Sequence, residues 1–496
     1  MQTKANAIYV DPHLLKTVTK PLKKATSVKY VIYNDATHQP VPDEQLEAFK
    51  SAHPELTVLS FGELRALGEA NPLDPVPPKP EDTYCIMYTS GSTGPPKGVP
   101  VTHANFVAAV AGLHSVVEES VSHREYVLAY LPLAHILELV LENLVLFVGA
   151  TLGYGSTRTL SDTSMRNCVG DMRAFKPTIM VGVPTVWETV KKGVTSRVDS
   201  SGALTKALFW GAFNLKSFLV AHNLPGQTLL DGVVFGQVRA MTGGRLRFIV
   251  NGASGIAGMT AQFMSMVVAP MINGYGLTET NGNGALGSPL QWTSSAIGPV
   301  GGAVEIKLVS IPELDYSASA TPPQGEILIR GPAVFSSYYE NPEETAKALT
   351  HDGWFKSGDI GEFDANGHLK VIDRVKNLVK MQGGEYIALE KLEAIYRGAR
   401  FVGNVMVYAD AEHARPIAVV CPNEKVLAAK AAELGVDEHS MHTDKKVRAA
   451  VLKDLVAVGK DAGLSSMELV AGVVVVDEEW TPANVSFLLS NDRGRS

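Results

Sequence analysis

A segment rich in glycine and hydroxyl side chains, YTSGSTGPPKG from Tyr88 to Gly98, is the strongest candidate for chemistry in the chain. It follows the apolar run CIMYT, so we expect a strand that ends in a loop. Glycines let backbone N–H groups approach phosphate oxygens, and hydroxyls add donors. A P-loop needs Ser or Thr after Gly-Lys, whereas Gly98 follows Lys97 here, so we predict a phosphate loop of another type rather than a flexible linker. Its residues are Thr89, Ser90, Gly91, Ser92, Thr93, Gly94 and Lys97.

A second segment, NGYGLTET, covers residues 273–280. Tyr275 offers an aromatic face for a purine, and Gly274 and Gly276 flank it. Thr278 adds a hydroxyl, and Glu279 adds a hard carboxylate of the kind that suits Mg²⁺. Alone, GYG is a turn signal; together with the first loop it predicts a nucleotide site. Asn251, Gly252 and Ala253, after the apolar run RFIV, predict a second turn that faces the nucleotide.

Two later segments carry charges next to glycines. In WFKSGD, Asp359 follows a glycine turn and could accept hydrogen bonds from ribose hydroxyls; the alternative is a solvated turn aspartate. In VIDRVKNLVKMQGGE, cations lie just beyond a predicted strand, and a glycine pair gives the backbone freedom. The alternative there is a basic surface turn. The residues are Arg374, Lys376, Lys380, Gly383 and Gly384.

The elements that position these segments indicate an α/β fold. Short apolar runs at Ala7–Val10 and Val28–Tyr33 enclose a helix predicted at 13–24, and a Pro-rich linker follows at 71–80. Apolar runs then alternate with helical stretches to about residue 300, as in a layered α/β domain. Short strands and charged helices follow Arg374. We therefore predict a large α/β domain over 1–373 and a small α+β domain over 374–496.

Composition excludes several classes of protein. Hydrophobic residues make up 45% and charged residues 19% of the 496 residues, which argues against disorder. The net charge of -7, without a long basic run, argues against nucleic acid as a partner. Three widely spaced cysteines indicate a reducing compartment without disulfides. We find no secretory signal and no stretch apolar enough to span a membrane. The segment Leu204–Leu219 predicts a helix packed on the core, or else one lying flat on a membrane surface.

These four segments, in this order, resemble those of the adenylate-forming superfamily of acyl-CoA synthetases, luciferases and peptide-synthetase adenylation domains. YLPLAHILE at 130–138 and GEYIALEKLE at 384–393 look like eukaryotic long-chain fatty acyl-CoA synthetases. The resemblance implies ligation of a long-chain fatty acid to coenzyme A through an acyl-adenylate, with ATP and Mg²⁺, releasing AMP and pyrophosphate. It also implies an intracellular protein, in the cytoplasm or peripheral on the endoplasmic reticulum or lipid droplets. It does not indicate an oligomeric state.

The resemblance assigns roles to matching residues. The loop from Thr89 to Gly94 and Lys97 would hold the β- and γ-phosphates. Tyr275 would stack on adenine, with Asn251 to Ala253 on the other side of the base. Thr278 would contact the α-phosphate, Glu279 would hold the metal, and Asp359 with Arg374 would bind the ribose. His135 would lie near the mouth of the acyl pocket, Asp373 at the hinge of the small domain, and Lys380 with Gly383 and Gly384 would face the site during thioester formation.

The sequence departs from the family at both ends. The family's N-terminal region ahead of the segment matching Ala7 to Val10 is absent, and the likeness stops at Asn484. No residue matches the family's C-terminal lysine that bridges the substrate carboxylate and the α-phosphate; Arg493 and Arg495 are cationic but lie in the short tail. The competing hypothesis is therefore a truncated chain or pseudoenzyme that binds nucleotide or acyl-adenylate without efficient turnover. A reductase or P-loop ATPase is disfavoured because neither phosphate loop occurs.

Overall fold

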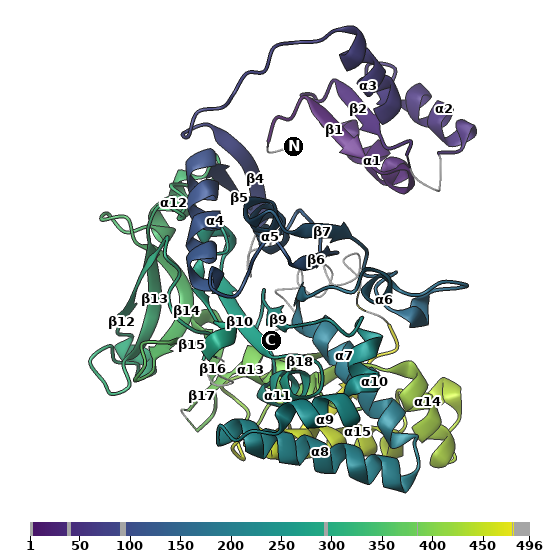
Figure 1. Cartoon of the computed structure of the whole chain (residues 1–496), viewed down its shortest axis with the longest axis vertical. Coiled ribbons are helices and arrows are strands. Elements are labelled where there is room, and N and C mark those ends of the chain that lie inside the picture. The colour runs from purple at the N-terminus through teal and green to yellow at the C-terminus, as the bar shows by residue number, and fades with distance from the viewer. Residues whose placement is uncertain are drawn as a thin grey trace. The chain divides into compact units, whose positions relative to one another are not determined.

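A computed structural model describes residues 3–36, 41–89, 96–291, 296–383, 385–478 and 480 (Figure 1). The chain forms two compact units, Met1–Pro78 and Lys79–Ser496. The division falls within the Pro-rich linker predicted at 71–80.

The N-terminal unit is a three-stranded parallel sheet with helices between its strands. The helix predicted at 13–24 is present, and α3 begins with a capping box in which Ser60 and Glu63 each accept from the other's backbone N–H. Neighbouring parallel strands must be joined by a crossover connection, usually a helix. The alternation of short strands and helices in the sequence therefore accounts for the parallel sheet of order β1-β2-β3. The elements are β1 (Ala7–Val10), α1 (Leu15–Leu22), β2 (Tyr30–Tyr33), α2 (Asp43–Ala52), β3 (Thr57–Ser60) and α3 (Phe61–Ala70).

The second unit contains a six-stranded sheet of order β11-β10-β9-β8-β6-β7, in which β6 to β10 run parallel. These strands are short and apolar, as expected when helices cover the sheet. A hairpin of β4 (Thr83–Thr89) and β5 (Lys97–Thr102) precedes it. The sheet strands are β6 (Tyr126–Ala129), β7 (Thr151–Tyr154), β8 (Ile179–Gly182), β9 (Phe248–Asn251), β10 (Met271–Gly276) and β11 (Gly284–Leu286).

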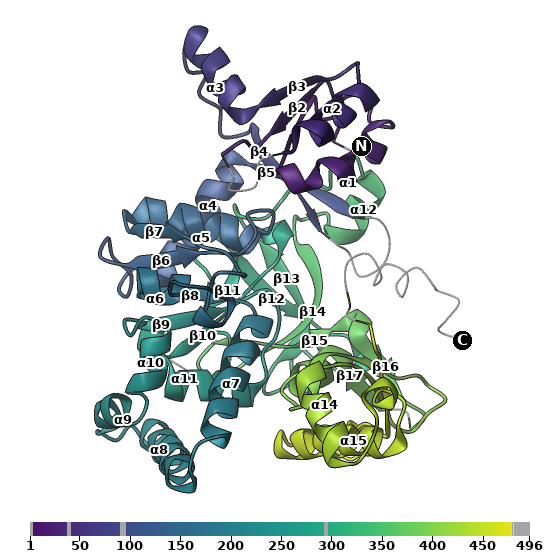
Figure 2. The same ribbon diagram turned by 90° about the vertical axis from the view of Figure 1, so that its right-hand side faces the viewer.

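Helices surround this sheet and close its core (Figure 2). One large core cluster gathers side chains of β8, β9 and α11 with those of α7 and α8. Phe209 and Ala212 of α8 belong to it, so the prediction that Leu204–Leu219 packs on the core is confirmed. The helices are α4 (His103–Val117), α5 (Ile136–Val148), α6 (Asp171–Phe175), α7 (Pro184–Asp199), α8 (Ala203–Ala221), α9 (Gln227–Val233), α10 (Gly236–Met241) and α11 (Gly258–Val267).

A four-stranded antiparallel sheet, β12-β13-β14-β15, follows along the chain. Its strands are β12 (Glu305–Val309), β13 (Gln324–Arg330), β14 (Phe355–Phe363) and β15 (Leu369–Arg374), with α12 (Pro342–Ala348) before β14. The register of β14 and β15 places Asp359 directly opposite Arg374. Two residues from separate sequence motifs are thus brought together by one hairpin.

The strands after Arg374 pair only with one another in the described residues. Their buried cluster runs from Met381 to Val475 and includes no residue of the earlier sheets. This separation favours the small α+β domain predicted after Asp373, whose boundaries stay a prediction. Its elements are β16 (Leu378–Lys380), β17 (Tyr386–Ala388), α13 (Leu389–Tyr396), β18 (Val402–Tyr408), β19 (Ile417–Pro422), α14 (Glu424–Glu433), α15 (Lys445–Asp461) and β20 (Gly472–Val475).

The combination of a layered α/β region with a further α+β region agrees with the predicted α/β class. Across the described part of the chain, we find no helix that is both long and apolar enough to traverse a bilayer.

Candidate active site

Three predicted residues meet at the end of β10. The Tyr275 hydroxyl donates to Asp359 Oδ2 at 2.7 Å, and Arg374 Nε lies 3.0 Å from Asp359 Oδ1. The Asp359 backbone N–H donates to Ser357 Oγ, which fixes the turn before the carboxylate. Burial raises the pKa of Asp359, while Arg374 and the Tyr275 hydroxyl oppose that shift. Both carboxylate oxygens are therefore held by defined donors.

A second group of side chains, Lys97, Glu279 and Tyr338, links the β4–β5 hairpin to the turn after β10. Glu279 is buried in a short helical turn that begins at Thr278, and its Oε1 accepts from the Tyr338 hydroxyl at 2.7 Å. Lys97 Nζ lies 4.9 Å from the centroid of the Tyr338 ring. Tyr338 thus joins the predicted metal carboxylate to the predicted phosphate-binding lysine.

Lys97 also forms an ion pair with α12. Its Nζ lies 2.6 Å from Glu344 Oε2, and Lys347 donates to the other oxygen of that carboxylate. The hydrogen bonds from Lys347 and then Lys97 lower the pKa of Glu344 to about 2. Thr89 lies opposite Lys97 in the hairpin register, at the base of the predicted loop. The loop residues Ser90 to Gly94 lie outside the described residues.

The turn after β9 is shaped by close backbone approach. The Asn251 side-chain amide donates to the Ser254 carbonyl and to Asn273 Oδ1. Ala253 adopts a left-handed backbone with φ of +69°. A Cβ at Gly252 would lie 3.0 Å from Leu137 Cδ2, so the turn and the start of α5 are in contact.

Glycine is required at position 276 by contact between two backbones. A Cβ there would lie 2.3 Å from the carbonyl carbon of Gly282, which no side chain could accommodate. At Gly274 the same construction meets Leu286 at 3.3 Å, a tighter approach than usual but with a flexible neighbour. The glycines that flank Tyr275 therefore have distinct packing reasons.

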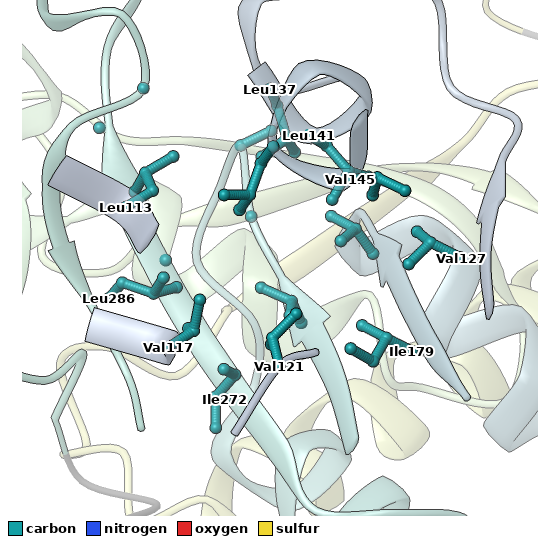
Figure 3. A pocket seen from close by; sticks show the side chains of 18 of the residues that line it. Leu113, Val117, Val121, Val127, Leu137, Leu141, Val145, Ile179, Ile272 and Leu286 are labelled. Atoms are coloured by element: carbon teal, nitrogen blue, oxygen red, sulfur yellow. The ribbon is translucent and has the colours of Figure 1, made fainter. Parts of the chain in front are cut away.

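An apolar cavity lies between the sheet and helices α4 and α5 (Figure 3). At one end it is lined by Gly252, Ala253, Tyr275 and Gly276, the residues of the two predicted nucleotide turns. At the other end it is lined by Ile179 and Phe248, which open β8 and β9, and by residues next to them. Since β9 advances about 3.3 Å per residue, the cavity runs about 13 Å from Phe248 to Gly252. Further lining side chains are Leu113, Val117, Val121, Val127, Leu137, Leu141, Val145, Ile272 and Leu286.

His135 stands where this cavity meets the loop before α5. It caps the helix, because its Nδ1 accepts from the Leu137 backbone N–H at 3.2 Å, and burial lowers its pKa. His135 and Tyr275 are the polar side chains among the residues that line the cavity. Glu138, three residues further along the chain, is 1% exposed, and its carboxylate accepts from the Leu131 N–H. Burial raises the pKa of Glu138 to about 7.

The remaining predicted residues lie apart from these groups. Lys380 is exposed at the end of β16, with its Nζ 5.7 Å from the centroid of Tyr386. A Cβ at Gly383 would face Met467 at 3.8 Å. Asp373 is buried, and its carboxylate accepts from the backbone N–H groups of Arg374 and Lys391. In the described residues, therefore, Lys380 and Gly383 are not united with Tyr275 or Glu279; Gly384, Arg493 and Arg495 lie outside them.

Sequence analysis missed Tyr338 and the walls of the cavity. Tyr338 belongs to the run GPAVFSSYYENPEET, whose two adjacent tyrosines next to an acidic helix start were the available signal. The cavity walls gave no such signal, because apolar residues on α4 and α5 have the same periodicity whether they face a cavity or a packed core.

Comparisons with known proteins agree with this architecture. The profile of the family "AMP-binding enzyme" matches residues 2–339. A palmitoyl-CoA ligase, FUM16, of Gibberella moniliformis is 54% identical over 97% of this chain and 71% of its own length. Long-chain-fatty-acid–CoA ligase 1 of Saccharomyces cerevisiae is 44% identical over 98% of this chain and 72% of its own length.

Solved structures resemble it as well. The adenylation domain of a carboxylate reductase from Mycobacterium chelonae superimposes with a TM-score of 0.77 at 25% identity, over 97% of this chain and 69% of that one. That of a carboxylic acid reductase from Segniliparus rugosus gives 0.74 at 22% identity, over 97% and 71%, which shows the shared fold. The chain therefore belongs to the AMP-binding enzymes of the adenylate-forming superfamily, in the family of the long-chain-fatty-acid–CoA ligases.

Proposed function

We propose that the protein ligates a long-chain fatty acid to coenzyme A at the expense of ATP, through an acyl-adenylate. The observation that carries this proposal is the apolar cavity, which ends at Gly252, Ala253 and Tyr275. An alkyl chain would be sheltered there from water, and its carboxylate would emerge beside the turns that would hold the nucleotide. The substrates named for the relatives, palmitate and long-chain fatty acids, suit such a lining.

The polar groups suggest how ATP would be oriented. Tyr275 would present its ring to adenine, Asp359 with Arg374 would bind the ribose, and Lys97 with the hydroxyl loop would hold the terminal phosphates. Thr278 would contact the α-phosphate. The roles of Tyr275, Asp359, Arg374 and Lys97 stand on the resemblance and on the hydrogen bond and ion pairs that hold these side chains. The roles of Thr278 and the hydroxyl loop stand on the resemblance.

Glu279 fits a magnesium ion in its donor chemistry. No cluster of three or more His, Cys, Asp or Glu side chains with metal-binding geometry is found among the described residues. Mg²⁺ usually needs no such cage, since one or two carboxylates, waters and substrate phosphates suffice. When bound, Mg²⁺ would neutralise part of the phosphate charge, and Tyr338 would orient the Glu279 carboxylate toward it.

Two displacements complete the reaction. The fatty carboxylate attacks the α-phosphorus of ATP and pyrophosphate leaves; the thiolate of coenzyme A then attacks the acyl carbonyl and AMP leaves. The chain contributes mainly position and charge to both steps. The resemblance implies that Lys380, Gly383 and Gly384 would serve the second step after the small domain turns about Asp373.

Formation of palmitoyl-CoA from palmitate, coenzyme A and Mg-ATP tests the proposal, with AMP and pyrophosphate measured alongside. Equal amounts of AMP, pyrophosphate and thioester are expected. ADP in place of AMP, or thioester without ATP, would exclude this reaction. The alternative of a nucleotide-binding chain without turnover finds no support in the comparisons. An intracellular location, in the cytoplasm or on the surface of the endoplasmic reticulum or lipid droplets, is part of the same proposal.

A further inference from the structure

The ion pair between Lys97 and Glu344 engages the lysine on which the proposed phosphate site depends. Lys97 begins β5, and Glu344 lies in the first turn of α12. The backbone fastens the two segments together, because the Tyr339 N–H donates to the Gly98 carbonyl at 2.8 Å. Lys97 Nζ lies 2.6 Å from Glu344 Oε2, and the two side chains are 25% and 29% exposed. The fold therefore holds the two charges against each other at the mouth of the β4–β5 hairpin.

Glu344 has a second partner on its own helix. Its Oε1 accepts from Lys347 at 2.8 Å, whereas its Oε2 faces Lys97. The Glu344 backbone N–H donates to the side chain of Asn341, which caps α12 and fixes the first turn. Hydrogen bonds from Lys347 and then Lys97 lower the pKa of Glu344, so the carboxylate is ionised near neutral pH. If Lys97 turned to another anion, Glu344 would keep its pair with Lys347, and no unpaired charge would be left.

Lys97 likewise has a second contact, which does not involve Glu344. Its Nζ lies 4.9 Å from the centroid of the Tyr338 ring, within the range of a cation–π contact. Tyr338 is 6% exposed and is held at two points. Its hydroxyl donates to Glu279, and its backbone N–H donates to Thr345 Oγ1 at 2.9 Å. The ammonium of Lys97 can therefore exchange one anionic partner for another without leaving the face of this ring.

We propose that the Glu344 carboxylate occupies Lys97 in place of the terminal phosphates of ATP and so lowers the affinity of the site for ATP. A carboxylate and a phosphate are alternative partners for one ammonium, because both present anionic oxygens as strong acceptors. When Mg-ATP binds, a phosphate oxygen displaces Glu344 from Lys97, and the carboxylate remains on Lys347. This inference rests on the proposed function, which assigns the terminal phosphates to Lys97.

The alternative is that Glu344 orients Lys97 toward the phosphates. The Tyr338 ring already holds the ammonium, so orientation does not require the carboxylate. The direct contact at 2.6 Å instead takes up a donor that a phosphate oxygen would use. The two roles predict effects of opposite sign. Neutralising Glu344 should tighten ATP binding if the carboxylate competes with phosphate, and should weaken it if the carboxylate orients the lysine.

Calorimetric titration of the whole chain with Mg-ATP and, separately, with AMP tests the inference, without fatty acid or coenzyme A. Glu344→Gln keeps the shape of the side chain and removes its charge. The Kd for Mg-ATP should fall about two- to five-fold, the scale of one partly exposed ion pair. The Kd for AMP should stay unchanged, because AMP has no terminal phosphates to reach Lys97. An unchanged Kd for AMP also shows that the nucleotide site of the variant is intact.

Glu343→Gln is the matched control, since Glu343 is the neighbouring acid of α12 and pairs with Lys347 instead of Lys97. It should bind Mg-ATP like the parent. In a Lys97→Met background, Glu344→Gln should no longer tighten Mg-ATP binding, and a gain that persisted there would show general repulsion in place of competition and overturn the inference. Unchanged or weaker binding by Glu344→Gln alone would overturn it too, while leaving the proposed function in place. A parent that binds no Mg-ATP would overturn both.

Discussion

The polar groups around Tyr275 and the apolar cavity meet at the same two turns but are built on different principles. On the polar side, each functional group has a named partner: Tyr275 and Arg374 hold Asp359, and Tyr338 holds Glu279. On the apolar side, many aliphatic side chains line the cavity together, and no single contact defines the shape of the cavity. Single substitutions should therefore be severe on the polar side and graded on the apolar side.

The largest effect is expected at Glu279. Glu279→Gln keeps the shape and the acceptor for Tyr338 but removes the negative charge needed for a divalent cation. The turnover rate with Mg-ATP should fall on the order of 10² to 10³-fold, as for loss of one preorganised charge in a transition state. Steady-state kinetics at varied magnesium concentration provide the measurement. Glu343→Gln, at an exposed acid of α12, is the control, and equal activity of both variants would remove Glu279 from the site.

Asp359→Asn should be the next most severe change. It leaves Arg374 without its ion-pair partner and weakens the acceptors expected for ribose hydroxyls. The KM for ATP should rise about 10- to 100-fold, as for loss of a charged hydrogen bond, with little change in the KM for palmitate. If only the KM for palmitate rose, the ribose would have to bind elsewhere.

Substitution at the far end of the cavity should produce a graded change. Ala150 lines the cavity just before β7, at the end opposite Tyr275. Ala150→Phe should lower kcat/KM for hexadecanoate about ten-fold while sparing octanoate, because added volume there shortens the space for the alkyl chain. Leu146→Phe introduces the same ring at an exposed position of α5 outside the cavity and is the control. Equal losses with both acids would mean that the cavity does not measure chain length.

Glu138 should produce the smallest effect, visible only as a pH dependence of stability. Burial raises its pKa from 4.5 to about 7, so the folded chain retains a proton that the unfolded chain releases over that interval. Stability is therefore lost as pH rises from 4.5 to 7, by on the order of 2–3 kcal/mol. Glu138→Gln is neutral throughout and retains an acceptor for Leu131. Its melting temperature relative to the parent should be higher at pH 8 than at pH 5, whereas exposed Glu433→Gln should show no such difference; a constant offset for Glu138→Gln would contradict the raised pKa.

The sequence was informative where chemistry depends on residue type in a fixed local order. Tyr275, Asp359 and Arg374 come from separate motifs, yet the fold joins them through a hydrogen bond and an ion pair; that they bind a nucleotide stays a prediction. Tyr338 could not be predicted, because its role comes from a hydrogen bond to Glu279, which lies 59 residues earlier in the chain. No local sequence pattern encodes such a contact. The position of Lys380 could not be predicted either, since it depends on how the small domain is oriented rather than on the segment itself.

Gly276 has a consequence for mechanics. Its backbone touches that of Gly282, and the Gly282 N–H donates to the Leu277 carbonyl, so the chain between them is a closed backbone ring that carries Thr278 and Glu279. Side-chain rotations cannot change the separation between Tyr275 and this ring, because main-chain atoms set it. The two residues that would bracket ATP, Tyr275 at the base and Glu279 near the phosphates, therefore extend from main-chain positions whose separation the backbone sets.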